Sequence, residues 1–222
     1  MAPFGKIYSY PTNPRVTRVM VMAEMNGLEI EIPPFTMRET NATPEFLAKF
    51  PLGKVPAFEG ADGFLLTESL AIAYYVAQAG PKADQLLGKD AKTQALIRKW
   101  ASFAEGEIFT NAFMPIAMAV MKFYPMNEGA FDMHIKNLEK DIKALEVALE
   151  GGKKYLVGDQ VTMADFSVAS WLYHLFKHFG DAEMRKANPN LTAYFEAFAA
   201  VPEHKKYFGE PEFAEARLTR EG

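Results

Sequence analysis

FPLGKVPAFEGADGFLLTES, residues 50–69, decides how the N-terminal part of this chain folds. Two prolines near its start disfavour both a helix interior and a central strand, so we expect a stiff corner there. Strand-like residues then flank the segment GADG at residues 60–63, which is typical of a β-hairpin turn. The segment TES at residues 67–69 follows, and there we expect the second hairpin strand to give way to a helix.

Helices and strands alternate around this stretch. Asn13 precedes Pro14 and Thr43 precedes Pro44, and a capping residue before a proline at the first helical position predicts a helix start. The resulting order is β-α-β-α-β-β-α. In full, we expect strands at 6–10 and 28–33, helices from 14 and from 44, hairpin strands at 56–59 and 64–67, and a helix over 68–78.

After about residue 90 only helical periodicity is visible. Thr162 and Asp165 form a capping box at one helix start. Pro115 is expected to kink a long helix over about 93–123. One apolar stripe recurs every three or four residues and predicts a further amphipathic helix: Phe131, Ile135, Leu138, Ile142, Leu145 and Leu149.

This change of pattern predicts two domains. We expect an α/β domain over residues 1–81, a linker over 82–92 and an all-helical domain over 93–222. Each domain is long enough to bury a hydrophobic core of its own.

Composition excludes several classes of function. The net charge is −4 and no block of five like charges appears, so we expect no direct binding of nucleic acid. Cysteine is absent, which excludes disulfides, thiolate metal sites and a nucleophilic sulfur supplied by the protein. No apolar run reaches the roughly 18 residues of a membrane span, and the N-terminus shows no secretory signal. We therefore expect a cytoplasmic protein without membrane partners.

The corner and the following helix start have features of a binding site. If the Val55-Pro56 bond is cis, the Val55 backbone turns outward and can pair with a peptide-like ligand; the alternative is an ordinary trans turn. At the helix start, amide groups and the Ser69 hydroxyl suit a carboxylate, and Glu68 suits an ammonium group. The alternative is that both residues only favour the first helical turn.

Several motifs together resemble the glutathione transferase superfamily. The stretch NATPEFLAKFPLGKVPAFEGADGFLLTESLAIAYYVA is similar to its glutathione site, and VGDQVTMADFSVASW is similar to its helical-domain capping motif. More narrowly, IYSYPTNPRV, RKWASFAE and YLVGDQVTMADFSVA resemble the glutathione-transferase domain of translation elongation factor 1 gamma and its fungal relatives. The resemblance covers essentially the whole chain and implies a thioredoxin-like N-terminal domain followed by a helical domain.

The resemblance also implies roles for individual residues. Val55 would pair with the cysteinyl backbone of glutathione, and Pro56 would be the cis-proline. Glu68 and Ser69 would hold the γ-glutamyl end. Lys54 would reach the glycyl carboxylate, or it is an ordinary surface lysine.

Thiol activation is the step for which the sequence departs from the family. Asn13 lies where serine-using relatives carry their hydroxyl, and an asparagine amide is an ordinary neutral donor. Its alternative role is that of a helix cap. Thr12 is the second candidate, and the hydroxyls of Ser9 and Tyr8 lie nearby in the sequence. Arg15 and Arg38 are further candidates for binding a carboxylate.

An acceptor pocket between the domains would be walled by Phe113 and Met114, although aromatic and methionine stripes more often belong to a core. We expect Trp100 and Phe103 to be core residues. His174 and His178 share a helical face, but two imidazoles form only half a zinc site, so no metal is expected.

The sequence thus leaves two functions open. The first is a glutathione transferase that conjugates glutathione, its co-substrate, to small hydrophobic electrophiles. The alternative is a weakly active or non-catalytic docking module of an elongation factor 1 complex, with elongation factor subunits as partners. Because the sequence ends at Gly222 without a further domain, we expect the enzyme, and the resemblance implies a homodimer. Thiol transfer by a protein cysteine is excluded because the sequence has none.

Overall fold

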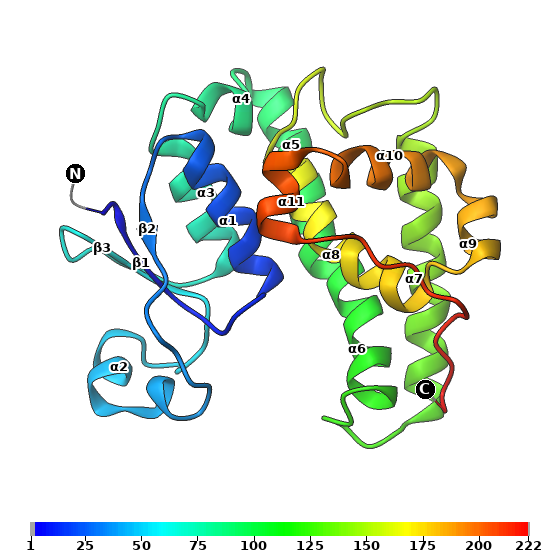
Figure 1. Ribbon diagram of the computed structural model, residues 1–222, viewed down its shortest axis with the longest axis horizontal. Helices are drawn as coiled ribbons and strands as arrows, with labels where there is room; N and C mark the ends of the chain where they lie inside the picture. The colour runs from blue at the N-terminus through cyan, green and yellow to red at the C-terminus, as the bar shows by residue number, and fades with distance from the viewer. Residues whose placement is uncertain (1–2, 222) are drawn as a thin grey trace. The chain divides into compact units, whose positions relative to one another are not determined.

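The computed structural model describes residues 3–221, so the outermost residues of the predicted domains lie outside the described range. The chain forms two compact units, the N-terminal unit Met1–Ala91 and the C-terminal unit Lys92–Gly222. The N-terminal unit combines a sheet with helices, and the C-terminal unit is mostly helical (Figure 1). The predicted fold class is confirmed.

A mixed sheet forms the centre of the N-terminal unit. Its strands are β1 (Gly5–Tyr8), β2 (Ile30–Glu31), β3 (Ala57–Gly60) and β4 (Leu65–Leu66), in the spatial order β2-β1-β3-β4. β1 is parallel to β2 and antiparallel to β3, which is antiparallel to β4. β1, β2 and β4 are shorter than predicted, whereas β3 has the predicted length and lies one residue later. β2 ends before Pro33 because proline has no N–H to donate to a ladder.

Three of the predicted helices surround this sheet: α1 (Pro14–Met25), α2 (Pro44–Lys49) and α3 (Ser69–Gln78); a 3₁₀ turn, η1 (Thr40–Ala42), precedes α2. The predicted caps are present. The Asn13 side chain accepts from the Arg15 N–H at 3.0 Å, and the Thr43 hydroxyl oxygen accepts from the Phe46 N–H at 3.2 Å. Both helix starts predicted from a capping residue before proline are confirmed.

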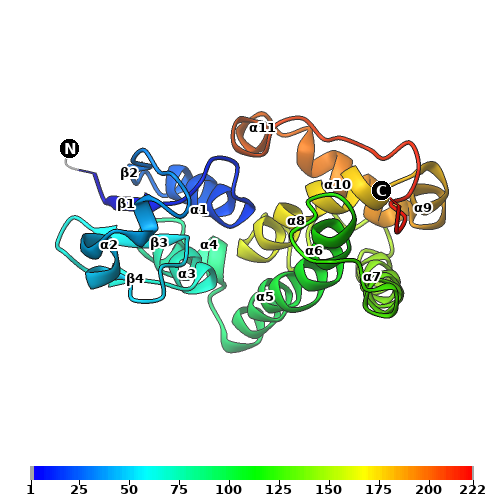
Figure 2. The ribbon, with the colours of Figure 1, turned by 90° about the horizontal axis from the view of Figure 1, so that it is seen from below.

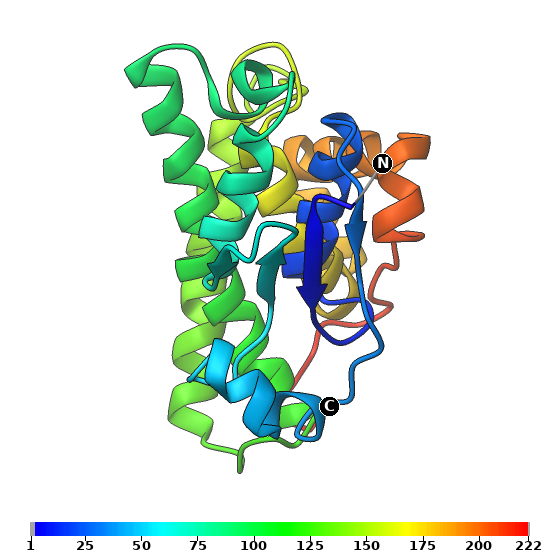
Figure 3. The same ribbon diagram turned by 90° about the vertical axis from the view of Figure 1, so that its left-hand side faces the viewer.

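α1 and α3 lie side by side against the sheet, and Figure 3 looks onto the strands with α1 behind them. Asn26, the residue that ends α1, fixes the C-terminal ends of both helices. Its amide donates to the carbonyls of Val76 and Ala77 at 2.9 and 3.1 Å, and its oxygen accepts from the Lys82 N–H at 2.8 Å. Gly80 is required at this contact because a Cβ there would come within 2.6 Å of the Asn26 side chain.

The segment predicted to be a linker contains a short helix, α4 (Ala83–Leu87). Leu86 and Leu87 are buried, and the compact N-terminal unit extends through this segment to Ala91. The helices of the C-terminal unit are α5 (Ala91–Phe103), α6 (Phe109–Ala119), α7 (Glu128–Ala148), α8 (Met163–Phe179), α9 (Ala182–Ala187), α10 (Pro189–Ala199) and α11 (Pro202–Phe208). Among residues 3–221, no helix combines the length and apolarity needed to cross a membrane.

The long helix predicted over about 93–123 is interrupted, but not at Pro115. A π-helical turn, η2 (Ala104–Ile108), separates α5 from α6, while Pro115 lies inside α6. A π turn adds a residue to the helix without ending it, so helical structure continues from α5 through η2 into α6. The prediction of one continuous helix was therefore wrong, while the kink expected at Pro115 stays a prediction.

The core of the C-terminal unit follows the predicted pattern. α7 runs alongside α6 (Figure 2) and buries most of its apolar stripe. The capping box at the start of α8 is present. The Thr162 hydroxyl oxygen accepts from a backbone N–H of the first turn, and the Asp165 carboxylate accepts from the Thr162 N–H. Phe176 and Phe195 stack with ring centroids 4.3 Å apart at the centre of this unit.

Candidate functional site

The corner before β3 leaves a stretch of backbone outside the sheet. The Val55-Pro56 peptide bond is cis, and β3 begins only at Ala57. Within residues 3–221, the N–H and C=O groups of Val55 make no hydrogen bond. A half-buried backbone with both groups open is suited to pair with an extended peptide.

A neighbouring loop supports this corner. The Asn41 amide donates to the Gly53 carbonyl at 2.6 Å, and the Asn41 oxygen accepts from the Arg38 N–H at 2.6 Å. Gly53 and Arg38 both have positive φ, which glycine adopts readily and arginine does not. Lys54 is exposed beside the corner, where its ammonium is free to swing toward an anion.

The start of α3 is strained and uncapped. Glu68, its N-cap residue, has φ +65° and ψ +112°, a conformation that costs a non-glycine residue about 1–3 kcal/mol. Its exposed side chain makes no capping hydrogen bond. The N–H groups of the first turn and the half-buried Ser69 hydroxyl are therefore available to an external acceptor such as a carboxylate.

One residue at this site was missed by the sequence analysis. Arg18, on α1, is completely buried, and its guanidinium Nη2 donates to the Ser69 hydroxyl oxygen at 2.9 Å. The available signal was a single cation in the middle of an otherwise apolar helix face. Neighbouring Val19 and Met22 are also fully buried.

Strand registers bring the predicted site residues to one end of the sheet. Phe58 lies opposite Leu66 in the hairpin, so continuing the pairing places Pro56 and Glu68 at the same end. Tyr8 lies opposite Ala57, so the chain leaves β1 toward Asn13 at that end as well. The corner, the start of α1 and the start of α3 therefore surround one region.

Asn13 is held as a structural cap. Only 2% of it is exposed, its amide donates to the Ser9 hydroxyl at 2.9 Å, and its oxygen caps the Arg15 N–H. Thr12 is exposed and has φ +61°, and its hydroxyl donates to the Pro11 carbonyl at 2.6 Å. Of the two predicted thiol-activating residues, Thr12 is the exposed one and Asn13 is buried.

Tyr8 is not a suitable donor to a thiolate. Its hydroxyl donates to Glu59 at 2.7 Å, and Lys49 contacts the other carboxylate oxygen at 2.7 Å. Burial, together with the bond to Glu59 and its negative charge, raises the pKa of Tyr8 to about 12. The bonds from Lys49 and Tyr8 hold the pKa of Glu59 below its usual value. This trio stabilises the sheet and keeps the phenol proton bound.

The predicted acceptor-pocket residues contact the core of the C-terminal unit. Phe113 stacks on Phe109 with centroids 5.1 Å apart, and Met114 packs against the cluster that contains Met118 and Phe131. Both side chains are half-buried, so each retains an open side. Trp100, predicted to be core, is 6% exposed.

His174 and His178 both lie on α8, four residues apart on one helix face. Burial, and to a lesser degree the nearby His178 and Lys177, lower the pKa of His174, so the imidazole is neutral near pH 7. In the part of the chain that the structure describes, no group of three or more histidine or acidic residues is arranged to hold a metal ion.

A buried polar cluster beside the π turn also escaped the sequence analysis. The Asn111 amide donates to Asp141 at 2.8 Å, and its oxygen lies 3.1 Å from the His134 Nδ1. Burial raises the pKa of the Asp141 carboxyl, opposed by the bond from Asn111. The signal was an asparagine within the apolar sequence of α6. Because these groups satisfy one another, the cluster joins α6 to α7.

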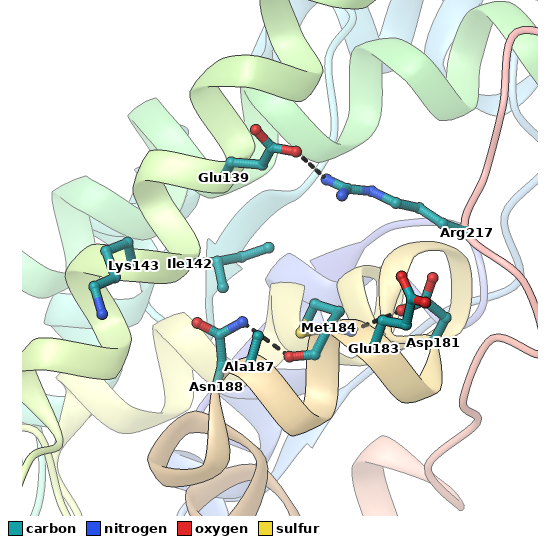
Figure 4. Close-up of a pocket in the computed structure, with 9 residues that line it drawn as sticks. All are labelled: Glu139, Ile142, Lys143, Asp181, Glu183, Met184, Ala187, Asn188 and Arg217. Carbon is teal, nitrogen blue, oxygen red and sulfur yellow. Dashed lines mark hydrogen bonds and ion pairs between the residues drawn. The ribbon is translucent and has the colours of Figure 1, made fainter.

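A separate pocket of about 410 Å³ lies within the C-terminal unit, between α7, α9 and the C-terminal segment (Figure 4). Its polar groups are largely paired: Arg217 lies 3.1 Å from Glu139, the Asn188 amide donates to the Met184 carbonyl, and Asp181 caps the Met184 N–H. Its charges are of both signs, and Figure 4 shows the ion pair between Glu139 on α7 and Arg217 on the C-terminal segment. The lining therefore presents both acidic and basic side chains, and no single ligand chemistry is indicated.

Comparison with known proteins places this arrangement in a family. The sequence pattern of the glutathione S-transferase N-terminal domain matches residues 3–78, and that of the glutathione S-transferase C-terminal domain matches residues 114–211. The chain is 44% identical to the glutathione S-transferase-like protein LUC7 of Fusarium sp over 221 residues, which is 100% of each chain. It is 35% identical to elongation factor 1-gamma-A of Xenopus laevis, over 93% of this chain and 47% of that protein.

Solved structures agree with the sequence relatives. The crystal structure of the glutathione S-transferase-like domain of elongation factor 1-gamma from Saccharomyces cerevisiae aligns with a TM-score of 0.80 at 26% identity, over 99% of both chains. A structure of glutathione S-transferase-I bound with lactoylglutathione aligns with a TM-score of 0.79 at 25% identity, over 93% of this chain and 99% of that one. The resemblance expected from the sequence is confirmed across both units, and this chain belongs to the glutathione S-transferase family.

Proposed function

We propose that this protein is a glutathione transferase that binds glutathione, stabilises its thiolate and conjugates it to small hydrophobic electrophiles. The observation that carries this proposal is the open backbone of Val55 beside the cis-proline, at the same end of the sheet as the uncapped start of α3. A tripeptide with a charged amino-acid head matches both features.

Each part of glutathione has a matching group. The cysteinyl backbone pairs with the N–H and C=O of Val55 as an added strand would. The glutamyl carboxylate binds the Ser69 hydroxyl and the first amides of α3, where the helix dipole favours negative charge. Glu68 pairs with the glutamyl ammonium, and Lys54 pairs with the glycyl carboxylate.

The chemical step depends on the bound thiol losing its proton. Lowering a thiol pKa from about 8.5 to about 6.5 requires roughly 2.7 kcal/mol of preferential thiolate stabilisation. In our proposal the Thr12 hydroxyl gives up its hydrogen bond to the Pro11 carbonyl and donates to the sulfur, and the amide groups at the start of α1 add to this, with Asn13 holding that helix start in place. The thiolate then attacks the electrophile, and a carbon–sulfur bond forms as the leaving group departs.

Two measurements on the same sample test this function. Isothermal titration calorimetry measures glutathione binding, and conjugation of 1-chloro-2,4-dinitrobenzene measures turnover above the uncatalysed rate. Binding with turnover supports the transferase. Absence of any heat of binding at millimolar glutathione contradicts the proposal. The roles of Phe113 and Met114 toward the electrophile stay predictions, tested by the change in KM for the acceptor in Phe113→Ala and Met114→Ala.

A second candidate function has its own support. The chain is similar to elongation factor 1-gamma proteins, and Asn13 is buried and engaged as a cap instead of presenting a donor to the thiol site. In this reading the protein is a docking module of an elongation factor 1 complex with little turnover. Glutathione binding without conjugation, together with capture of elongation factor subunits, would favour it. The expected homodimer is tested in either case by sedimentation equilibrium.

A further inference from the structure

Arg18 lies where an uncharged side chain would be expected. It is 0% exposed and belongs to the helix face that α1 packs toward α3. Burying a cation is unfavourable unless partners compensate, so a charge in this position calls for an explanation beyond packing. One of its partners is the Ser69 hydroxyl at 2.9 Å, the first residue of α3.

The chemistry of this hydrogen bond determines what Ser69 can do. A guanidinium has only donors, so the Ser69 oxygen is the acceptor. A hydroxyl has one proton, and within the described residues the Ser69 hydroxyl makes no second hydrogen bond. Its proton is therefore left to donate elsewhere. Arg18 thus turns Ser69 into a committed donor at the start of α3.

The nearby positive charges also favour a negatively charged acceptor for the Ser69 hydroxyl. The buried guanidinium and the positive end of α3 both favour a negative group beside Ser69, and buried charges are screened less by salt than exposed ones. Arginine suits this position better than lysine because its guanidinium stays protonated when buried and holds its donors in a rigid plane.

We propose that Arg18 is a positioning residue that acts through Ser69 to hold the α-carboxylate of the glutamyl group of glutathione. This inference rests on the proposed function. Arg18 does not touch the ligand. Its hydrogen bond fixes the direction of the Ser69 proton, so that the hydroxyl need not reorient when the carboxylate arrives.

The test compares two ligands by calorimetry: glutathione, and γ-aminobutyryl-cysteinyl-glycine, which is glutathione without the glutamyl α-carboxylate. We expect Arg18→Gln to weaken glutathione binding about tenfold and to leave binding of the analogue nearly unchanged. Arg18→Lys should recover part of the loss, since a lysine also donates to Ser69. The control Lys82→Gln removes an exposed cation from the same unit and should change neither affinity.

Ser69→Ala makes the test specific to the route through the hydroxyl. Alone it should weaken glutathione binding by a similar factor, and adding Arg18→Gln to it should cost little more. Equal losses for both ligands, or full additivity of the two substitutions, would overturn the inference.

A measurement without mutation covers the case in which Arg18 variants do not fold. In the wild-type protein, the nitrogen-15 resonance of the Arg18 side chain should shift when glutathione is added and shift much less with the analogue. Equal shifts overturn the inference. If the wild-type protein binds neither ligand, the proposed function fails; if it binds glutathione with an affinity that is insensitive to Arg18, only this inference fails.

Discussion

Two helix starts in this protein are built in opposite ways. At α8 the chain satisfies the start itself: the buried Asp165 carboxylate accepts from the N–H groups of Leu156 and Thr162 and from the Tyr194 hydroxyl. At α3 the N-cap Glu68 is exposed, strained at φ +65° and makes no capping bond. One start is closed by the protein, and the other is open.

This difference indicates that the start of α8 has a structural role and that the start of α3 is a candidate binding site. A buried carboxylate with four bonds is a part of the core, because each buried donor around it needs that acceptor. A strained, open start is unfavourable for folding alone, and such conformations cluster at ligand sites. A ligand carboxylate at α3 would do for that helix what Asp165 does for α8.

The largest expected effect is at the closed start. Asp165→Ala leaves four donors without their acceptor, namely the N–H groups of Leu156 and Thr162 and the hydroxyls of Thr162 and Tyr194. We therefore expect a loss of about 3–5 kcal/mol in the free energy of unfolding. Urea denaturation measures it. Asp159→Ala, an exposed aspartate in the preceding loop, should stay within about 0.5 kcal/mol of the wild type. A loss below about 1 kcal/mol in Asp165→Ala would contradict the closed-cap description.

The open start should respond in the opposite direction. Glu68→Gly relieves the positive φ, which glycine adopts freely, and we expect about 1 kcal/mol of added stability. The same change removes the carboxylate proposed for the glutamyl ammonium, so glutathione affinity should fall. Thermal unfolding and calorimetry on one sample report both. Glu45→Gly, in the first turn of α2, is the control, since it should lower stability without changing affinity. A Glu68→Gly variant that is less stable than the wild type would show that no strain is stored there.

Local patterns explain what the sequence could predict. The starts of α1 and α2, the hairpin turn and the Thr162–Asp165 box each involve residues a few positions apart, so their spacing carries the information. The contacts that define the candidate site join residues far apart in the sequence, so spacing does not predict them. Arg18 bonds to Ser69 and Tyr8 bonds to Glu59, in each case across 51 positions. Such pairs depend on strand register and helix packing, which the residue pattern alone does not specify.

The same reasoning accounts for the errors. No residue type in Ala104–Ile108 marks this segment as a π turn, so the sequence does not predict it. Pro115 is a recognised helix breaker, yet it lies inside α6. The linker was predicted from the change between mixed α/β and all-helical patterns, which does not show that Leu86 and Leu87 are buried. Asn13 was correctly predicted as a cap, and its burial shows why a cap and a thiol donor are competing roles for one amide.

Substitutions with a smaller expected effect distinguish the helix-cap role of Asn13 from the thiol-donor role. Asn13→Ala removes the cap of α1 and should cost about 1 kcal/mol of stability, whereas Asn13→Ser retains a capping oxygen. If Thr12 and the start of α1 stabilise the thiolate, Thr12→Val should raise the pKa of bound glutathione while Asn13→Ser should not. Ultraviolet absorbance of the thiolate, followed against pH, measures this. A raised thiol pKa in Asn13→Ser but not in Thr12→Val would reverse the assignment.

The smallest expected effect concerns an internal contact at the same end of the sheet. Glu59 is tied to Lys49 and Tyr8, and its lowered pKa means that it stabilises the fold above about pH 4.5 and loses this contribution as pH falls through its folded pKa. Because the partly exposed Lys49 is screened by solvent, Glu59→Gln should cost no more than about 1 kcal/mol at neutral pH, and the difference from the wild type should shrink in acid.

Tyr8 reports the same change at high pH. Its raised pKa stabilises the fold below pH 10 and is lost between there and about 12. In Glu59→Gln the pKa of Tyr8 should fall only partway toward 10, because burial is the larger cause of the shift and remains. Phenolate absorbance against the wild type measures this. An unchanged titration would mean that the Tyr8 hydroxyl does not depend on Glu59, and Tyr8 would again be a possible donor at the open end of the sheet.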